Sequence, residues 1–166
     1  MPNVCLILSG PPQAAYPNGG DEAYWMGQVA GALAAHLARR GIELCWGKPS
    51  QPDPEALWLV LGSQAAPAEE EGSKKGPVVL AGGQSQISAQ AAQAVGEQLS
   101  RVYPQPELLV VEEAPNTLPE EFPGEGVLVR LLYRDNPQDE AWLARNTGPV
   151  GEALAQGIAQ VVKGHA

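Results

Sequence analysis

Short, mostly apolar runs recur along this chain, and they constrain its fold more than any other feature. They occupy residues 3–8, 42–46, 56–62, 78–81, 108–111 and 127–133. Apolar and polar residues do not alternate within most of them, which is typical of strands that are buried on both faces. Apolar residues at helical spacing mark the segments 21–40, 85–101 and 148–162. This order predicts an α/β fold with a mostly parallel central sheet that is flanked by helices.

The stretch 127–143, VLVRLLYRDNPQDEAWL, contains the most informative strand end. Its apolar run stops before Asn136 and Pro137, a pair that favours a turn. Pro137 suits the first turn of a helix, because its fixed φ is helical and its missing N–H is not needed there. Asn136 then takes the N-cap position, and Asp139 and Glu140 lie in the first turn, where carboxylates favour the helix dipole. We therefore predict a buried strand, a turn and a helix that starts at Pro137.

Arg130 interrupts this apolar run. A charge inside a buried strand is costly unless it is paired or reaches solvent at a cleft. Sites in open α/β sheets gather at the carboxyl ends of the strands. Arg130 therefore indicates that this strand end faces a site.

The same stretch resembles the last strand and following turn of the zinc-dependent N-acetylmuramoyl-L-alanine amidases. The shared order is an apolar strand, one charged residue, further apolar residues, then Tyr-x-Asp-Asn-Pro and a Trp-Leu pair. In that family the charged residue is the catalytic glutamate, and in this chain it is Arg130. The resemblance implies an amidase-like (phosphorylase/hydrolase-like) three-layer architecture for a single domain over residues 1–166. One departure is the connection at residues 47–54, which is too short for the helix that the family usually has there.

Three further positions correspond to zinc ligands of that family. The turn that starts at Ser9 has no histidine where the family has its first ligand. Glu22, at the start of the first long helix, matches the glutamate ligand. After the third strand, Gly62 stands in place of the second histidine, Ser63 follows it, and Gln64 replaces an asparagine. The resemblance therefore implies that Glu22 is the one retained ligand of three. Glu22 also has a plainer interpretation, as an acid that favours the helix dipole.

These departures predict that the family's chemistry is lost. A catalytic zinc site needs three protein ligands and an open position for water. Arg130 cannot take up a proton at neutral pH, and its charge opposes a nearby cation. We therefore expect no catalytic residue and no cofactor, zinc included.

The leading interpretation is a non-catalytic binding or scaffolding module whose partner is a peptidoglycan fragment or a protein. Its candidate cleft residues are Ser9, Glu22, Gly62, Ser63, Gln64 and Arg130. Arg130 would either contact a carboxylate of the ligand, which a planar guanidinium does well, or pair with Glu22 in the space that zinc left.

Two other functions stay open. One is an active cell-wall amidase, a peptidoglycan hydrolase with a displaced metal site or no metal. Its carboxylates would come from Glu22 and from the loops at residues 69–71 or 112–113. The weaker one is a flavodoxin-like ligand-binding module, for which the chain has no phosphate-binding motif.

The histidines and cysteines offer no clear metal site. His36 lies late in the first helix, and His165 is next to the C-terminus, where chains fray. Cys5 and Cys45 fall in predicted strands and are expected to be buried, reduced thiols, because one pair in a chain of 166 residues is not a disulfide framework.

Charge and hydropathy exclude several partners. The net charge is −9, the sequence pI is about 4.6, and Lys and Arg do not cluster. This argues against a nucleic-acid surface and gives no reason to expect an anionic membrane as a partner. No segment has the length of a membrane span, and the N-terminal apolar run is too short for a signal peptide. The chain as given is expected in the cytoplasm, unless it is exported by another route or cut from a longer exported protein.

Overall fold

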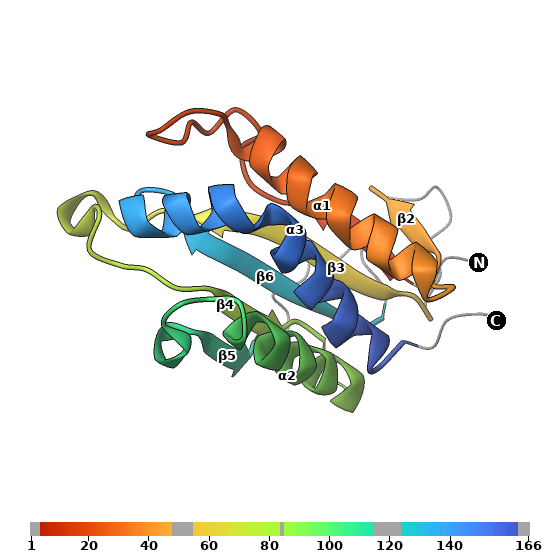
Figure 1. Ribbon diagram of the computed structural model, residues 1–166. Helices are drawn as coiled ribbons and strands as arrows, with labels where there is room; N and C mark the ends of the chain where they lie inside the picture. The colour runs from red at the N-terminus through yellow and green to blue at the C-terminus, as the bar shows by residue number, and fades with distance from the viewer. Residues whose placement is uncertain (1–3, 48–54, 84, 115–123, 163–166) are drawn as a thin grey trace.

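The computed structural model describes residues 4–47, 55–83, 85–114 and 124–162. Within these ranges six strands form one sheet, and three helices pack against it (Figure 1). The strands are β1 (Val4–Leu8), β2 (Leu44–Trp46), β3 (Leu57–Gln64), β4 (Val78–Ala81), β5 (Val110–Glu113) and β6 (Gly126–Tyr133). The helices are α1 (Glu22–Arg39), α2 (Gln86–Ser100) and α3 (Pro137–Ala159), with short 3₁₀ turns at η1 (Ala68–Glu70) and η2 (Pro106–Leu108).

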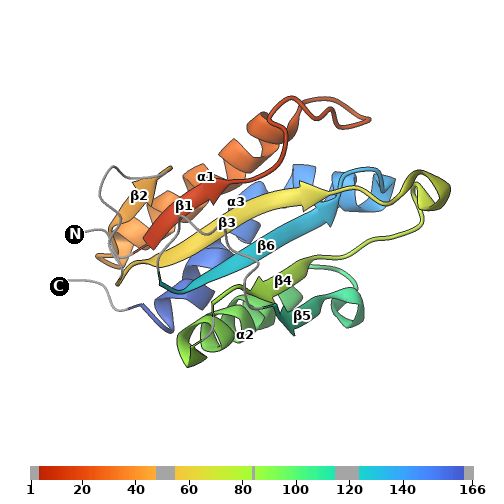
Figure 2. The ribbon, with the colours of Figure 1, turned by 180° about the vertical axis from the view of Figure 1, so that it is seen from behind.

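The sheet is mostly parallel. Its strand order is β2-β1-β3-β6-β4-β5, and among these strands only the β4–β6 pair is antiparallel. In Figure 2 the arrowheads of β1, β3 and β6 point one way and the arrowhead of β4 points the other way. The predicted α/β class, with a mostly parallel sheet and flanking helices, is confirmed.

All three described helices lie on the same face of the sheet, with α3 between α1 and α2 (Figures 1 and 2). Strand side chains alternate between the two faces, so every second residue meets these helices. Leu59, Leu61 and Val129 are among those that are fully buried in this main core. Other buried apolar side chains form two separate clusters on the opposite face: Cys5, Ala56, Trp58, Val60, Leu80 and Leu128. The connections at residues 48–54 and 115–123 lie outside the described residues.

Polar side chains cap each helix. Asp21 caps α1, Ser85 caps α2 and Asn136 caps α3, each through a side-chain oxygen that accepts a hydrogen bond from a backbone N–H of the first turn. These bonds satisfy donors that a helix start leaves without partners. The predicted N-cap at Asn136 is confirmed. Within the described ranges, no helix combines the length and the apolar character needed to cross a membrane.

Helix α3 differs from the sequence expectation. The pattern places helix starts at Pro137 and Gly148, whereas the structure has one element that is kinked at Asn146, where φ is −132°. Pro149 explains the kink, because proline has no N–H for the helical hydrogen bond and its ring crowds the carbonyl four residues before it. The two predicted helical segments are therefore arms of one bent helix.

Several strand boundaries also differ. β5 lies two residues later than the predicted run at 108–111, so residues 112–113 belong to the strand and not to a loop. β3 continues past the expected end at Gly62 to Gln64, because Gln64 pairs with Tyr133 after a bulge in the β3–β6 ladder. Ser63 therefore belongs to the strand and not to the following loop. β2 begins at Leu44 instead of residue 42, although Ile42 is buried in the core.

Glycines set the close packing of α3 against its two neighbours. A β-carbon at Gly151 would come within 2.5 Å of the Ala32 β-carbon and 2.8 Å of the Leu33 nitrogen on α1. A β-carbon at Gly157 would come within 2.7 Å of the Val95 α-carbon on α2. The three helices can approach this closely only because these two positions have no side chain.

We expect Gly151→Ala to destabilise the protein by about 2 kcal/mol, because the added methyl group must push α1 and α3 apart. Gly31→Ala is the matched control, since Gly31 lies in α1 with open space around it. That variant should gain roughly 0.5–1 kcal/mol from helix propensity. Urea denaturation of both variants measures the difference, and equal stabilities would contradict the helix packing described above.

Candidate functional site

The carboxyl ends of β1, β3 and β6 meet at one edge of the sheet (Figure 2). The loop at residues 9–21 and the segment at 65–77 extend past this edge, and α3 begins there (Figure 1). These loops bring the candidate residues of the sequence together with side chains that sequence reasoning did not select.

Glu22 is buried at this edge, and hydrogen bonds surround its carboxylate. The residue is only 2% exposed. Its Oε1 accepts hydrogen bonds from the hydroxyls of Tyr16 (2.6 Å) and Ser63 (2.7 Å), and its Oε2 accepts one from the Ser63 N–H (2.9 Å). Such donors replace the water that a buried carboxylate loses. Glu22 thus ties the loop after β1 to the end of β3, which is more than a contribution to the helix dipole.

The hydrogen-bonded cluster continues to Arg134, in the turn after β6. Its Nη1 donates to the Ser63 hydroxyl at 3.1 Å, and that hydroxyl donates in turn to Glu22. A cation therefore stands one hydroxyl away from the buried carboxylate. Nothing in the sequence pattern singled out Arg134, because it occupies an ordinary turn position between Tyr133 and Asp135.

Tyr16 is the second member that sequence reasoning missed, because it lies in a loop rich in Pro and Gly. Burial, followed by the hydrogen bond to Glu22, raises the pKa of Tyr16 above its ordinary value of 10.0, while Ser63 and Arg134 oppose the rise. The hydroxyl therefore stays protonated and acts as a donor to Glu22 at neutral pH.

Ser9, Gly10 and Gly62 leave room for Glu22 to lie against the backbone. A β-carbon at Gly62 would collide with the Ser9 hydroxyl and would lie 3.4 Å from Glu22 Oε2. Gly10 has a φ of +87°, and a β-carbon there would lie 3.3 Å from the same oxygen. A histidine at position 62 would require Ser9 to move. Of the neighbours Gly62 and Ser63 in β3, Ser63 is the one that donates hydrogen bonds to Glu22.

Arg130 lies in β6, three residues before the end of this strand. It is in register with Gly62 of β3 on one side and Val78 of β4 on the other. It is half-buried and makes no hydrogen bond or ion pair with any residue that the structure describes, Glu22 included. Of the two roles left open for Arg130, the pairing with Glu22 is not seen among the described residues. The physical reason is that Tyr16 and Ser63 already satisfy the carboxylate.

Gln64 also has donor capacity to spare. Its Nε2 is buried and has no hydrogen-bond partner in the described part of the chain. A buried amide nitrogen without an acceptor is costly, so such an atom indicates a place for a water or a ligand acceptor. β6 and β3 thus each have one side chain, Arg130 and Gln64, with N–H donors that have no acceptor among the described residues.

Carboxylates at the start of α3 fasten the surrounding loops. Asp135 accepts hydrogen bonds from the backbone N–H groups of Ala66 (3.0 Å) and Gly72 (2.8 Å). Glu140, which is 3% exposed, accepts from the backbone N–H (2.6 Å) and the side-chain amide (3.0 Å) of Asn18. The loop after β1 and the loop after β3 are thus held by the same helix start.

Asp139 fastens the chain before β4 and the last residue of β6 in the same way. It accepts hydrogen bonds from the N–H groups of Gly76 (2.9 Å) and Tyr133 (3.0 Å) and from the hydroxyl of Tyr103. Burial, and then the bond to Asp139, raises the pKa of Tyr103 above its ordinary value. The sequence predicted Asp139 and Glu140 as first-turn acids, and the structure adds that both are buried.

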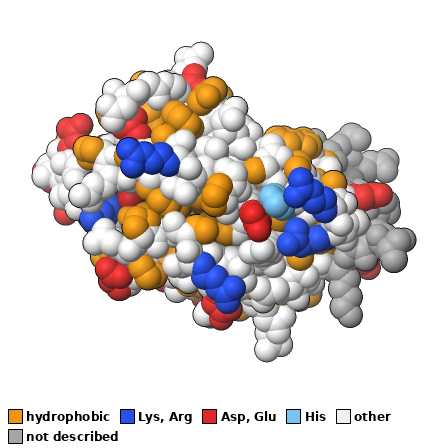
Figure 3. Space-filling model, in the orientation of Figure 1, with side chains coloured by type: hydrophobic (Ala, Val, Ile, Leu, Met, Phe, Trp, Pro, Cys, Tyr) orange, Lys and Arg blue, Asp and Glu red, His pale blue; other side chains and the backbone are white. Residues whose placement is uncertain are grey.

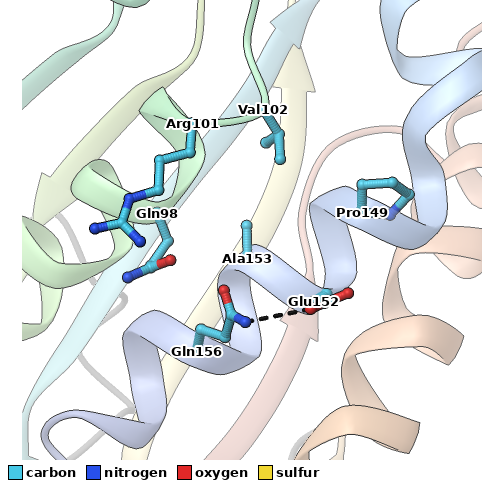
Figure 4. A pocket seen from close by; sticks show the side chains of 7 residues that line it. All are labelled: Gln98, Arg101, Val102, Pro149, Glu152, Ala153 and Gln156. Carbon is cyan, nitrogen blue, oxygen red and sulfur yellow. Dashed lines mark hydrogen bonds between the residues drawn. The ribbon is translucent and has the colours of Figure 1, made fainter.

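Two hollows occur near these elements. One, of about 420 Å³, lies beside the start of α3 and is lined by Gly72, Ser73, Lys75 and Gln138 among others. The other, of about 180 Å³, lies between α2 and α3, where Gln98 and Arg101 face Glu152 and Gln156 (Figure 4). Only the first lies at the sheet edge that carries Glu22. On the helix side of the molecule Lys and Arg are dispersed and form no continuous patch (Figure 3).

The donor set around Glu22 does not fit a catalytic zinc ion. Zinc is held by cysteine sulfur, histidine nitrogen and carboxylate oxygen, whereas the groups that bond to Glu22 are the hydroxyls of Tyr16 and Ser63 and the Ser63 N–H. Across the four described ranges, no group of three or more His, Cys, Asp or Glu residues could hold a metal. The Arg134 guanidinium would also repel a cation at this place.

The other candidate residues lie away from the cluster. His36 is near Glu152 on the helix layer (3.8 Å), and His165 falls outside the described residues. Residues 112–113 end β5, which runs opposite to β6, so they lie at the far edge of the sheet. In the segment 69–71, Glu70 pairs with Lys74 at 3.2 Å. None of these acids is among the groups that contact Glu22.

Comparison with known proteins identifies the fold. No protein-family model and no curated protein matches the sequence. Among solved structures, the chain is similar to the N-acetylmuramoyl-L-alanine amidase AmiC2 of Nostoc punctiforme, with a TM-score of 0.74, 14% identity and 95% of each chain covered. This chain has the fold of the N-acetylmuramoyl-L-alanine amidases. The predicted amidase-like architecture is therefore confirmed.

Two other amidases show the same likeness. The CwlD amidase from Clostridioides difficile, solved in complex with the GerS lipoprotein, gives a TM-score of 0.76 at 14% identity and covers 96% of this chain and 98% of its own. The catalytic domain of CwlV from Bacillus (Paenibacillus) polymyxa gives 0.72 at 14% identity and covers 95% and 97%. At these identities the likeness is one of fold.

The buried tyrosines predict a loss of stability at alkaline pH. Because the folded state raises the pKa of Tyr16 above 10.0, the unfolded chain releases this proton first. The stabilising contribution is therefore complete below about pH 10 and declines as the pH rises further. Tyr16→Phe should be less stable by about 1 kcal/mol at neutral pH and should decline less steeply above pH 10.

Urea denaturation between about pH 8 and pH 11 measures both effects. Tyr24→Phe is the control, since Tyr24 lies in the first turn of α1 and is 52% exposed. A Tyr16→Phe profile parallel to that of the unchanged protein would contradict the buried hydrogen bond to Glu22.

Proposed function

We propose that this chain is a non-catalytic protein of the amidase fold, which binds a carboxylate-bearing fragment of peptidoglycan at the carboxyl edge of its sheet. The observation that carries the proposal is the set of hydrogen bonds on the buried carboxylate of Glu22. Three hydrogen bonds from Tyr16 and Ser63 already hold both of its oxygens, and these neighbours are not zinc ligands.

The residues at the strand ends also lack the groups for general acid–base catalysis. A general base must be able to take up a proton near neutral pH, which carboxylates and histidines do. The resemblance to amidases places Arg130 where the catalytic glutamate would stand, and an arginine stays protonated. Among the described residues of this cluster the only acid is Glu22, and three hydrogen bonds already hold its carboxylate.

The groups without partners favour an anionic ligand. Among the described residues, Arg130 is half-buried without an acceptor, the Nε2 of Gln64 is buried without one, and Arg134 uses one of its five N–H donors on Ser63. A carboxylate can accept several such bonds at once, and charge-assisted bonds of this kind are stronger than neutral ones. The peptides of peptidoglycan fragments carry free carboxylates, which is why we place them first.

The first test is the zinc content of the purified protein, measured by elemental analysis before and after incubation with zinc. We expect no stoichiometric zinc in either sample, because one carboxylate and two hydroxyls make a poor site. We also expect no cleavage of purified muropeptides under the same conditions. One zinc per chain that disappears in Glu22→Ala would contradict the proposal and would favour an active amidase with an atypical site.

The second test is calorimetric titration with a soluble muropeptide that has a free terminal carboxylate. We expect binding that weakens roughly 10- to 100-fold in Arg130→Gln, the loss of one charge-assisted hydrogen bond. Arg145→Gln is the matched control, because Arg145 is an exposed arginine of α3 away from the strand ends. The same muropeptide with its carboxylate amidated should bind as weakly as the Arg130 variant.

Two results would overturn the choice of ligand. Equal affinities for the acid and the amide would show that the arginine does not recognise a carboxylate. No binding of muropeptides at all, with zinc and hydrolysis also absent, would direct the search to a protein partner. The structural neighbour CwlD, which was solved with a lipoprotein, makes that second form of the proposal reasonable.

A further inference from the structure

Cys5 and Cys45 lie opposite each other in neighbouring strands. They are paired residues in the parallel ladder between β1 and β2, between the Val4–Leu44 and Leu6–Trp46 pairs. Both side chains belong to the same small cluster on the sheet face away from the helices, with Ala56 and Trp58. Both are thiols in this structure. Side chains at paired positions of adjacent strands point to the same face, so the two sulfur atoms lie on one side of the sheet.

The strand geometry is close to that of a disulfide bond. Neighbouring strands are about 4.8 Å apart, which lies within the range of roughly 4.4–6.8 Å for the α-carbons of bonded cysteines. The bond also needs the β-carbons about 3.8 Å apart, and because backbone hydrogen bonds fix the spacing of the two strands, β2 must tilt locally to bring its β-carbon toward that of Cys5. β2 has three residues and one neighbouring strand, and it lies at the edge of the sheet. Such a short edge strand can make this movement with little disturbance of the core.

The two thiols differ in access to solvent. Cys5 is fully buried, whereas Cys45 is partly exposed next to Trp46, which is 54% exposed. A reagent in solution therefore reaches Cys45 first. Thiol–disulfide exchange needs only one accessible thiol, because the second thiol attacks the mixed disulfide from inside the protein.

We propose that Cys5 and Cys45 form an intrachain disulfide when the protein meets a small-molecule disulfide oxidant such as oxidised glutathione. The Cys45 thiolate attacks one sulfur of the oxidant, forms a mixed disulfide and releases one glutathione thiolate. The Cys5 thiolate then attacks the Cys45 sulfur, forms the Cys5–Cys45 bond and releases the second glutathione. The protein loses two electrons and two protons, and the oxidant becomes two glutathione thiols.

The bond would enclose the loop and helix that carry the site. The chain between the two cysteines contains the loop at residues 9–21 and the whole of α1, with Tyr16 and Glu22. Closing this segment into a ring lowers the conformational entropy of the unfolded chain, and it fixes β2 to the sheet by a covalent bond. Oxidation therefore stabilises the protein at the very segment that presents the candidate cleft.

The test treats the purified full chain with oxidised glutathione and compares it with the reduced protein. We expect the intact mass to fall by two hydrogens with no glutathione attached, and the denatured protein to lose both titratable thiols. Digestion should give one pair of peptides, containing Cys5 and Cys45, that separates on reduction. The apparent melting temperature should rise by roughly 5–10 °C and should return to its starting value on reduction.

Cys45→Ser is the matched control, because Cys45 is partly exposed and its replacement leaves the buried Cys5 in place. This variant should show no rise in melting temperature with the same oxidant, and circular dichroism in the reduced state checks that it folds. The proposal fails if the unchanged protein keeps both thiols, stops at a glutathione adduct on Cys45, or forms disulfide-linked dimers. It also fails if the linked protein melts at the same temperature as the reduced one.

Discussion

Buried carboxylates at the start of α3 hold the functional edge of this protein together. A carboxylate that leaves water must meet donors from the protein, and near a sheet edge those donors come from loops. Asp139 accepts hydrogen bonds from the backbone before β4 and at the end of β6, and Glu140 accepts them from Asn18 in the loop after β1. Segments that are more than a hundred residues apart along the chain are thus fixed to one helical turn. The loops around the candidate cleft are held in place by this requirement for donors, since they have little apolar surface to bury.

The same rule shapes the centre of the site. This chain shares its fold with amidases, and within it Glu22 is buried. The hydroxyls of Tyr16 and Ser63 donate hydrogen bonds to its carboxylate, and Arg134 donates to the Ser63 hydroxyl. Three hydrogen bonds hold this carboxylate in a network of protein donors. Arg130 and Gln64 show the opposite imbalance, with donors that have no acceptor among the described residues. The edge therefore has an excess of donors, which favours an acceptor-rich partner.

Much of the fold could be predicted from local sequence. Apolar runs of strand length gave each strand to within two residues at most ends, and the Asn136–Pro137 pair gave the start of α3. These features depend on neighbours in the chain, so periodicity and propensity reveal them. The site was predictable only in part. Glu22 and Ser63 were selected and lie together, whereas Tyr16 and Arg134 were missed because loop and turn positions carry no pattern that marks a hydrogen-bond partner.

The sequence by itself determined the elements, their order, the parallel character of the sheet and the edge at which polar residues gather, because each of these follows from local pattern and from the handedness of chain connections. Only the tertiary structure decided which donor forms a hydrogen bond with which acceptor. In the folded protein Glu22 accepts hydrogen bonds from Tyr16 and Ser63 and not from Arg130, and Cys5 lies directly opposite Cys45. The physical reason is that hydrogen bonds and strand register join residues that are distant in sequence, and their geometry is fixed only when the strands and helices pack around a common core.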